Sequence, residues 1–279
     1  IDLTCMAEDI NNDTLTYSWS AAAGSISAND DLATYTAPDQ EGNYFITCIV
    51  SDSDQLTDSD SIQGMVRDLS VEPSGRLMAH YPLDGNAQDA SGNGNHGSPL
   101  GITWATDKEE SPMKAAQFNG LSSSIRIPNS DLLNFQDALS IACWIKMDQF
   151  LEHEQHPVSH GSWQNRYKIS IGDQNFRFTV NTSDGIRDLD SEGTPSPGQW
   201  HHLAVVYNKT DMEIWLDGKL DAFSSHSGLI KKTVFDLVFG QNLPGDNNYN
   251  FKGRLDALSI FDYGLSPSQI ADHMENSIN

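Results

Sequence analysis

The chain of 279 residues exceeds the usual size of one domain, about 100 to 200 residues, so its length favours two domains. Its 39 Asp and Glu residues against 16 Lys and Arg give a net charge of -23, which repels phosphate backbones and argues against nucleic acid as a partner. No apolar run reaches the ~18 to 20 residues of a membrane span, which argues against membrane insertion.

Residues 1–70 alternate β-type runs, at 15–19, 33–36 and 44–50, with clusters of turn-forming residues. This spacing predicts a small antiparallel sandwich. The region is rich in carboxylates but has a single cationic side chain, Arg67, and no histidine. Few groups are available there to act as an acid, a base or a cationic clamp, so we interpret the region as a spacer. Residues 71–76 lack periodicity and are predicted to form a linker.

Residues 77–279 again have an almost entirely β pattern, with β-branched and aromatic runs at 140–146, 167–171, 176–180, 202–207 and 212–216. About 200 residues of such strands predict one large jelly-roll sandwich. Residues 266–274 have a helical pattern, with Ser266 as the N-cap and Pro267 at the first helical position. The predicted fold class is therefore all-β, with a short sandwich followed by a large one.

The three cysteines, Cys5, Cys48 and Cys143, are too few and too scattered for a zinc site. The order Cys5, Trp19, Cys48 resembles that of immunoglobulin-like domains, and residues 42–52 resemble the late strands of bacterial polycystic-kidney-disease (PKD)-like modules. The resemblance implies a Cys5–Cys48 disulfide, with two buried free thiols as the alternative. A disulfide would place the chain in a periplasm or outside the cell. Because the sequence opens at Ile1 and this domain is short for either family, we expect a piece of a longer, secreted bacterial protein.

Six motifs follow one another between residues 81 and 260, at 81–97, 116–120, 141–145, 198–204, 214–219 and 253–260. In this order they resemble the laminin G-like domains of the concanavalin A-like lectin/glucanase superfamily. The resemblance implies two curved antiparallel sheets and, in many members, a Ca²⁺ ion at the rim of the sandwich. The ligands of such domains vary widely, so the fold alone does not set the function.

The resemblance also implies a calcium site between the first motif and the penultimate strand. Ca²⁺ takes six to eight oxygen ligands, mostly carboxylates and exposed carbonyls. We expect side-chain ligands from Asp84, Asp89 and Asp256, and side-chain or backbone oxygens from Asn86 and Asn93. The alternative is that the Asn and Gly residues of this segment only form turns.

Two further polar stretches, residues 158–168 and 180–192, interleave aromatic rings with side chains that have planar or forked donors, and residues 241–249 offer a long loop to close the same rim. Sugar hydroxyls are recognised by such bidentate groups beside an apolar ring. The predicted glycan-binding residues are His160, Trp163, Arg166, Lys168, Asn181, Arg187, Asp188, Asp190 and Gln241. Arg166 and Lys168 lie two residues apart, so on one strand they would share a face, and these local cations favour an acidic or sulfated sugar. The alternative is an internal salt-bridge set of Arg166 and Arg187 with Asp188, Asp190 and Glu192.

Catalysis is the weaker interpretation. Asp188, Asp190 and Glu192 partly resemble the acidic motif of laminarinase-type glucanases, but Asp188 stands where that family has a Glu nucleophile. A lyase would draw on His160, Arg166, Tyr167 and Gln164, but the signatures of jelly-roll alginate lyases are absent. The histidines at 153, 156 and 160, with Glu152 and Glu154, are interpreted as solvated loop residues rather than a metal cluster. No residue is assigned a catalytic role.

The sequence therefore predicts a secreted or cell-surface module, stabilised by Ca²⁺, that binds a polysaccharide or cell-surface glycan without cleaving it. Two alternatives stay open. The first is an adhesive or structural module that binds protein, and the second is a polysaccharide lyase or glycoside hydrolase.

Overall fold

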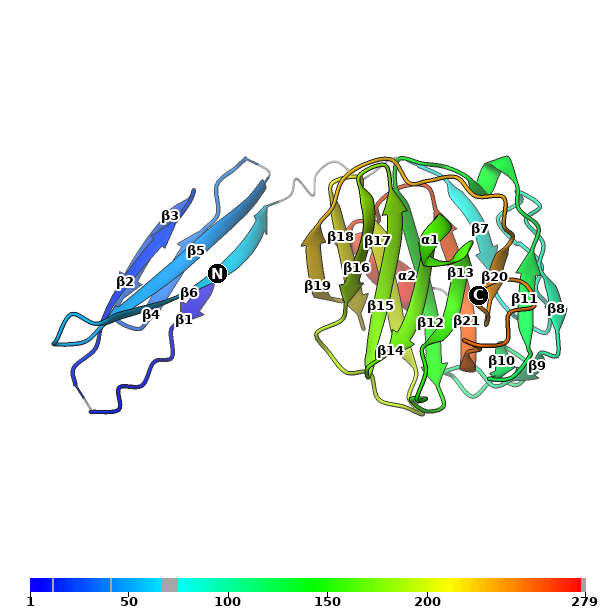
Figure 1. Cartoon of the computed structure of the whole chain (residues 1–279), viewed down its shortest axis with the longest axis horizontal. Helices are drawn as coiled ribbons and strands as arrows, with labels where there is room; N and C mark the ends of the chain where they lie inside the picture. Colours follow the sequence, from blue (N-terminus) through cyan, green and yellow to red (C-terminus); the bar gives the residue numbers. More distant parts are fainter. Residues whose placement is uncertain (12, 41, 67–74, 277–279) are drawn as a thin grey trace. The chain divides into compact units, whose positions relative to one another are not determined.

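The computed structural model describes residues 1–11, 13–40, 42–66 and 75–276. The chain divides into two compact units, Ile1–Glu72 and Pro73–Asn279 (Figure 1). Arg67 and most of the predicted linker, residues 71–74, lie outside the described residues. Within the described part of the chain, no helix has the length and apolar character needed to cross a membrane.

Unit 1 consists of two three-stranded antiparallel sheets. One has the order β1-β4-β3, from Asp2–Thr4, Leu32–Thr36 and Ser25–Asn29, and the other has the order β2-β5-β6, from Thr16–Ala21, Gly42–Ser51 and Thr57–Val66. Alternating inward residues, among them Tyr35, Ile46 and Cys48, are buried, as expected for strands with one solvated face. The immunoglobulin-like or PKD-like nature of this unit stays a prediction.

Unit 2 contains two larger sheets, which confirms the expected all-β, jelly-roll class. The eight-stranded sheet has the order β19-β18-β17-β12-β21-β10-β9, with β7 also paired to β21. These strands are β7 (Leu77–Tyr81), β9 (Thr103–Ala105), β10 (Ala115–Asn119), β12 (Leu139–Met147), β17 (His201–Tyr207), β18 (Asp211–Leu216), β19 (Lys219–Ser225) and β21 (Lys252–Phe261).

The seven-stranded sheet has the order β16-β15-β14-β13-β20-β11-β8 (Figure 1). Its strands are β8 (Ser98–Leu100), β11 (Ser124–Ile127), β13 (Gln155–His160), β14 (Tyr167–Gly172), β15 (Asn175–Thr182), β16 (Gly185–Asp190) and β20 (Leu237–Phe239). One short helix, α1 (Ser162–Asn165), connects β13 to β14, and the 3₁₀ turn η1 (Asp131–Leu133) precedes β12.

One apolar cluster draws on both sheets of unit 2. Ile141 and Val205 come from the eight-stranded sheet, and Phe178 and Phe239 from the seven-stranded sheet, and all four are almost fully buried. Burial of each such side chain stabilises the fold by roughly 1.5 to 3 kcal/mol. Because side chains alternate along a strand, the residues between these core positions lie on the outer faces.

The helix α2 (Pro267–Asn276) packs against the outer face of the eight-stranded sheet. Its Ile270 joins Ala142, Val206 and Trp215, which alternate with core residues along their strands. Ser266 begins the helix as predicted: its Oγ accepts the N–H of Gln269 at 3.3 Å, and Oε1 of Gln269 accepts the N–H of Ser266 at 2.9 Å. This reciprocal pair is a capping box, which satisfies two backbone donors of the first turn.

Candidate functional site

The outer face of the seven-stranded sheet carries polar side chains in register. Strand pairing aligns Asp188, Thr179, Lys168 and Ser159 in one row across β16, β15, β14 and β13, and the next row holds Asp190, Arg177 and Ser170. Their neighbours along each strand, such as Ile169 and Phe178, point into the core. We call these seven residues, together with Glu154 and His156, the polar face.

Glu154 is the centre of the polar face. Its Oε1 accepts hydrogen bonds from Nζ of Lys168 and from Oγ of Ser170, both at 2.6 Å, and its Oε2 lies 2.9 Å from Nε2 of His156. Burial raises the pKa of Glu154, but the hydrogen bonds from these three side chains outweigh it and hold the pKa well below its usual range. The carboxyl group is therefore ionised and fixed in place.

The β15 and β16 side of the polar face has two further fixed carboxylates. Arg177 donates from Nε and Nη2 to the two oxygens of Asp190, at 2.6 and 2.9 Å. Oδ1 of Asp188 accepts the hydroxyl of Thr179 at 2.6 Å. Both aspartates are exposed, so their remaining lone pairs are open to solvent or to a ligand.

A loop after β20, residues 241–250, closes one end of the polar face. The ring of Tyr249 stacks on His156 with centroids 5.0 Å apart and an interplanar angle of 13°, and Tyr249 is 37% exposed. The loop is braced by its own amides, because Gln241 donates to Asn247 at 2.7 Å and Asn242 donates to Asp246 at 3.0 Å. A flat aromatic ring is thus held beside the charged rows.

The helix α1 lies at the other end of β13 and packs against β13, β14 and β15 (Figure 1). The N–H of Ser162 donates to the hydroxyl of Ser159, and the Asn181 amide donates to the carbonyl of Gln164, so α1 folds over the outer face. Trp163 of this helix is 45% exposed. The outer face therefore has an exposed aromatic ring at each end.

A surface pocket of about 470 Å³ adjoins α1. It is lined by Asn129, Asp131, Asn134, Asn165, Lys232, Thr233 and Val234. Several of its polar groups already bond to one another: Asn134 donates to Asn129, and the N–H of Thr233 donates to Asn134. The pocket therefore offers a ligand fewer open groups than its composition suggests.

Two residues of the predicted glycan set, His160 and Arg166, are fully buried, which corrects the expectation that they face a ligand. His160 lies on the core side of β13, beside the ring of Tyr167, and burial lowers its pKa to about 3. Arg166 precedes β14 rather than belonging to it, so the prediction that it shares a face with Lys168 is wrong. Its guanidinium instead donates to the carbonyls of Lys231 and Phe135.

The other predicted glycan residues are dispersed around the outer face. Lys168, Asp188 and Asp190 belong to the polar face itself. Lys168, Asn181 and Gln241 are also buried, which corrects the expectation for them too: Asn181 lies beneath α1 and Gln241 in the loop after β20, while Trp163 is exposed at the opposite end of the sheet. Arg187 is at the sheet edge, where it donates to the hydroxyl of Ser224. The ion pair in this region joins Asp190 to Arg177, not to Arg166 or Arg187 as the salt-bridge alternative expected.

The predicted calcium ligands are tied into the fold individually. Asp89 is buried and accepts the backbone N–H groups of His80, Ser91 and Asn95, all at 2.9 Å, while Asp84 pairs with Lys114.

The amide of Asn86 donates to the carbonyl of Asp84, and the amide of Asn93 donates to the carbonyls of Leu77 and Met78. Burial, with neighbouring Asp107 and Asp84, raises the pKa of Asp256 to about 7.

As placed, Asp84, Asp89 and Asp256 do not form one metal-ligand group. The calcium ion itself stays a prediction.

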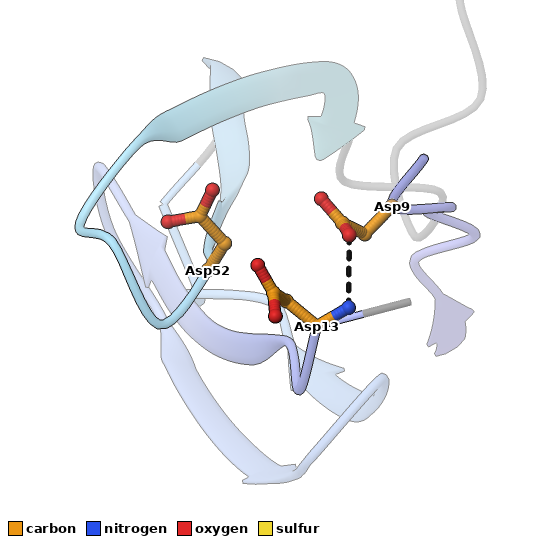
Figure 2. Close-up of side chains that lie close together, drawn as sticks. All are labelled: Asp9, Asp13 and Asp52. Atoms are coloured by element: carbon orange, nitrogen blue, oxygen red, sulfur yellow. Dashed lines mark hydrogen bonds between the residues drawn. The ribbon is translucent and has the colours of Figure 1, made fainter. Parts of the chain in front are cut away.

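Among the described residues, one trio of His, Cys, Asp or Glu side chains has ligand atoms within 4.8 Å of one another. It is Asp9, Asp13 and Asp52 in unit 1 (Figure 2). Oδ1 of Asp9 accepts the N–H groups of Asn11 and Asp13, and Oδ1 of Asp52 accepts that of Leu56, each at 2.8 Å. Three half-buried carboxylates in this arrangement have the chemistry to hold a divalent cation.

Sequence reasoning missed Glu154, His156, Ser159, Ser170, Arg177 and Thr179 as members of the polar face, although the loop 241–249, which carries Tyr249, is expected at the same rim. It treated His156 as a solvated loop residue, whereas His156 is a buried residue of β13. The available signal was the alternation of polar and apolar residues in 167–171 and 176–180, which places Lys168, Ser170, Arg177 and Thr179 on one side of two strands.

Comparison with known proteins agrees with the architecture of unit 2. A family model described as "Concanavalin A-like lectin/glucanases superfamily" matches residues 119–271. Pappalysin-1 of Mus musculus is 22% identical over 189 residues, which cover 59% of this chain and 11% of pappalysin-1. The chain thus corresponds to only a small part of that protein.

Three solved structures are similar in fold. Domain 4 of AbnA, a GH43 extracellular arabinanase from Geobacillus stearothermophilus in complex with arabinotriose, is 26% identical; the match covers 72% of this chain and 98% of that domain, with a TM-score of 0.59. The binding domain of Paraclostridial Mosquitocidal Protein 1 is 20% identical (71% and 52% covered, TM-score 0.59). That of botulinum neurotoxin serotype D/C is 13% identical (72% and 52% covered, TM-score 0.56). At these identities the two toxin domains show the fold alone.

Proposed function

Because the chain belongs to the concanavalin A-like lectin/glucanases superfamily, we propose that unit 2 is a carbohydrate-binding module that holds a polysaccharide on its polar face without cleaving it. One observation carries the proposal: the outer face of the seven-stranded sheet combines fixed carboxylates that solvent reaches with two exposed aromatic rings, Tyr249 and Trp163. Sugars are bound by this combination, since ring faces pack on aromatic side chains while hydroxyls bond to rigid polar groups.

The arabinanase domain supports a glycan as the ligand. It is matched over nearly its whole length and is described in complex with arabinotriose, a short neutral oligosaccharide. An extracellular setting is part of the proposal, because polysaccharides are met outside the cell and because that arabinanase is described as extracellular.

The state of the carboxyl groups favours binding over hydrolysis. A glycoside hydrolase needs a carboxylic acid whose pKa is raised so that it can protonate the leaving oxygen. On the polar face, Glu154 has a lowered pKa and Asp190 is held by Arg177. Asp256, whose pKa is raised, belongs to β21 of the other sheet.

The test is isothermal titration of the whole chain with a panel of polysaccharides that includes arabinan, with each mixture assayed for new chain ends. We expect binding without new ends, and a loss of about tenfold in affinity for Tyr249→Ala or Trp163→Ala. Phe45→Ala, which removes an exposed ring from unit 1, is the matched control and should leave affinity unchanged. The proposal would be contradicted by new chain ends, or by an affinity that is the same with Tyr249→Ala and Trp163→Ala as with the unaltered chain.

A further inference from the structure

The two cations of the polar face are already engaged by the protein's own carboxylates. Nζ of Lys168 lies 2.6 Å from Oε1 of Glu154, and the lysine side chain is only 5% exposed. Arg177 is bonded to both oxygens of Asp190. An anionic sugar, carrying a uronate or sulfate group, would have to displace one of these carboxylates before it met a free cation.

The accessible charges of the polar face are negative. Asp188 and Asp190 are exposed and Glu154 is partly exposed, so three carboxylates outnumber two cations. His156 does not alter this balance, because burial lowers its pKa although the hydrogen bond to Glu154 opposes that shift. Carboxylates repel anionic polysaccharides but accept hydroxyl hydrogens, which every neutral sugar offers.

We propose that the polar face selects neutral glycans over anionic ones, and that Glu154 sets this selectivity by occupying the ammonium group of Lys168. The inference rests on the proposed function and narrows it to a ligand class. It also reverses the preference for acidic or sulfated sugars that the sequence suggested, because Arg166 is buried and Lys168 is paired.

The first experiment uses the unaltered chain. Titration with arabinan, a neutral polysaccharide, and with polygalacturonate and a sulfated galactan should give binding to the neutral polymer alone. Its affinity should change less than about twofold between 20 mM and 300 mM NaCl, because no ion pair with the ligand is screened. Binding to a polyanion that weakens with salt would overturn this inference while leaving the proposed function intact. Binding to neither class would overturn both.

The second experiment changes Glu154 to Gln. This substitution keeps the shape and removes one negative charge, so Lys168 becomes available to an anionic ligand. Burial lowers the pKa of Lys168, and with Glu154 changed the charge of Asp188 still opposes this shift and favours the ammonium form. We expect affinity for the polyanions to rise by about tenfold or more.

Glu152→Gln is the matched control, because it removes the same charge from an exposed position two residues away. It should leave polyanion binding unchanged, and thermal unfolding should show that both variants are folded. Equal gains for the two variants, or no gain for Glu154→Gln, would show that Glu154 does not set the selectivity.

Discussion

Arg166 fills the space at the end of the sandwich near α1 instead of facing solvent. Its Nη1 donates to the carbonyl of Lys231 at 2.8 Å and its Nη2 to that of Phe135 at 2.5 Å. The guanidinium also lies 5.0 Å from the centroid of the Phe135 ring. A planar fork can serve two carbonyls of separate loops at once, so this residue holds the loops before β12 and before β20 to the start of β14.

Replacing Arg166 should therefore affect stability. We expect Arg166→Ala to lower the free energy of unfolding by about 3 kcal/mol, since a fully buried guanidinium is lost together with its hydrogen bonds to two partly buried carbonyls. Arg166→Lys should recover only part of this loss, because one ammonium group does not reproduce the fork. Urea denaturation of the whole chain measures both. The exposed Arg187→Ala should change stability by less than about 1 kcal/mol. If Arg166→Ala instead left stability unchanged and weakened glycan binding, the result would support the direct contact between Arg166 and the glycan that the sequence predicts.

Cys5 and Cys48 are free thiols in the structure and close enough to interact. Burial, and to a smaller extent the hydrogen bond with Cys5, raises the pKa of Cys48 to about 12. The disulfide stays a prediction: in chain purified without reductant, mass spectrometry of non-reduced peptides should find Cys5 linked to Cys48 and Cys143 free. Reduction should then lower the free energy of unfolding of unit 1 by about 4 kcal/mol. Three free thiols after oxidation would rule the bridge out.

At the scale of elements, α2 is joined to the sheet by a row of buried and half-buried polar groups. Nδ1 of His80 lies 2.9 Å from Oγ of Ser259, which lies 3.0 Å from Nε2 of His273; Nδ1 of His273 lies 3.0 Å from Nε2 of His202. Burial lowers the pKa of all three histidines, to about 3 for His202 and about 4 for His273.

The charged residues near these histidines have opposite effects on their protonation. Asp89 and Asp84 favour protonation of His80, and Lys108 opposes protonation of His202.

These three half-buried or buried histidines predict that the protein loses stability in mild acid. The folded pKa values lie below the unfolded value of about 6.5, so the unfolded chain binds more protons as the pH falls below 6.5. Between about pH 6 and pH 4, each of His202 and His273 should remove up to roughly 1.4 kcal/mol per pH unit. Urea denaturation at several pH values measures the slope. His202→Gln with His273→Gln should flatten it, while His153→Gln, at an exposed position, should not. An equal slope in all three proteins would contradict the assignment.

The elements also show which patterns can be read from the sequence. The runs at 140–146, 202–207 and 212–216 are strands, as their apolar β-branched and aromatic residues predict. The strand β6 has the sequence TDSDSIQGMV. Because its first half is polar, the sequence alone does not predict a strand there, and the segment becomes a strand by pairing with β5 along its length. The strand β13 is hard to recognise for the same reason, because its histidines are typical of a solvated loop. Pairing partners and covering loops decide such segments, and neither is visible in a local window.

At the scale of the whole molecule, all residues of the polar face lie in unit 2. A fragment of residues 75–279 should therefore fold alone and bind glycan with the affinity of the full chain. In calorimetry of the full chain, saturating glycan should raise the unfolding temperature of unit 2 alone. At a glycan concentration of one hundred times the Kd, the free energy of unfolding of unit 2 should increase by about 2.7 kcal/mol. A shift in the transition of unit 1, or loss of binding by the fragment, would show that unit 1 contributes to the site.

The sequence by itself determined the all-β class, the helix capped by Ser266 and the superfamily of unit 2, because periodicity, capping residues and motif order are properties of the linear chain. Tertiary structure alone decided the site. Glu154, Lys168 and Tyr249 come from separate segments that strand register and one stacked histidine bring together. Whether a cation such as Arg166 or Lys168 is free, paired or buried depends on what packs over it, and that is fixed only when the sheets and loops are assembled.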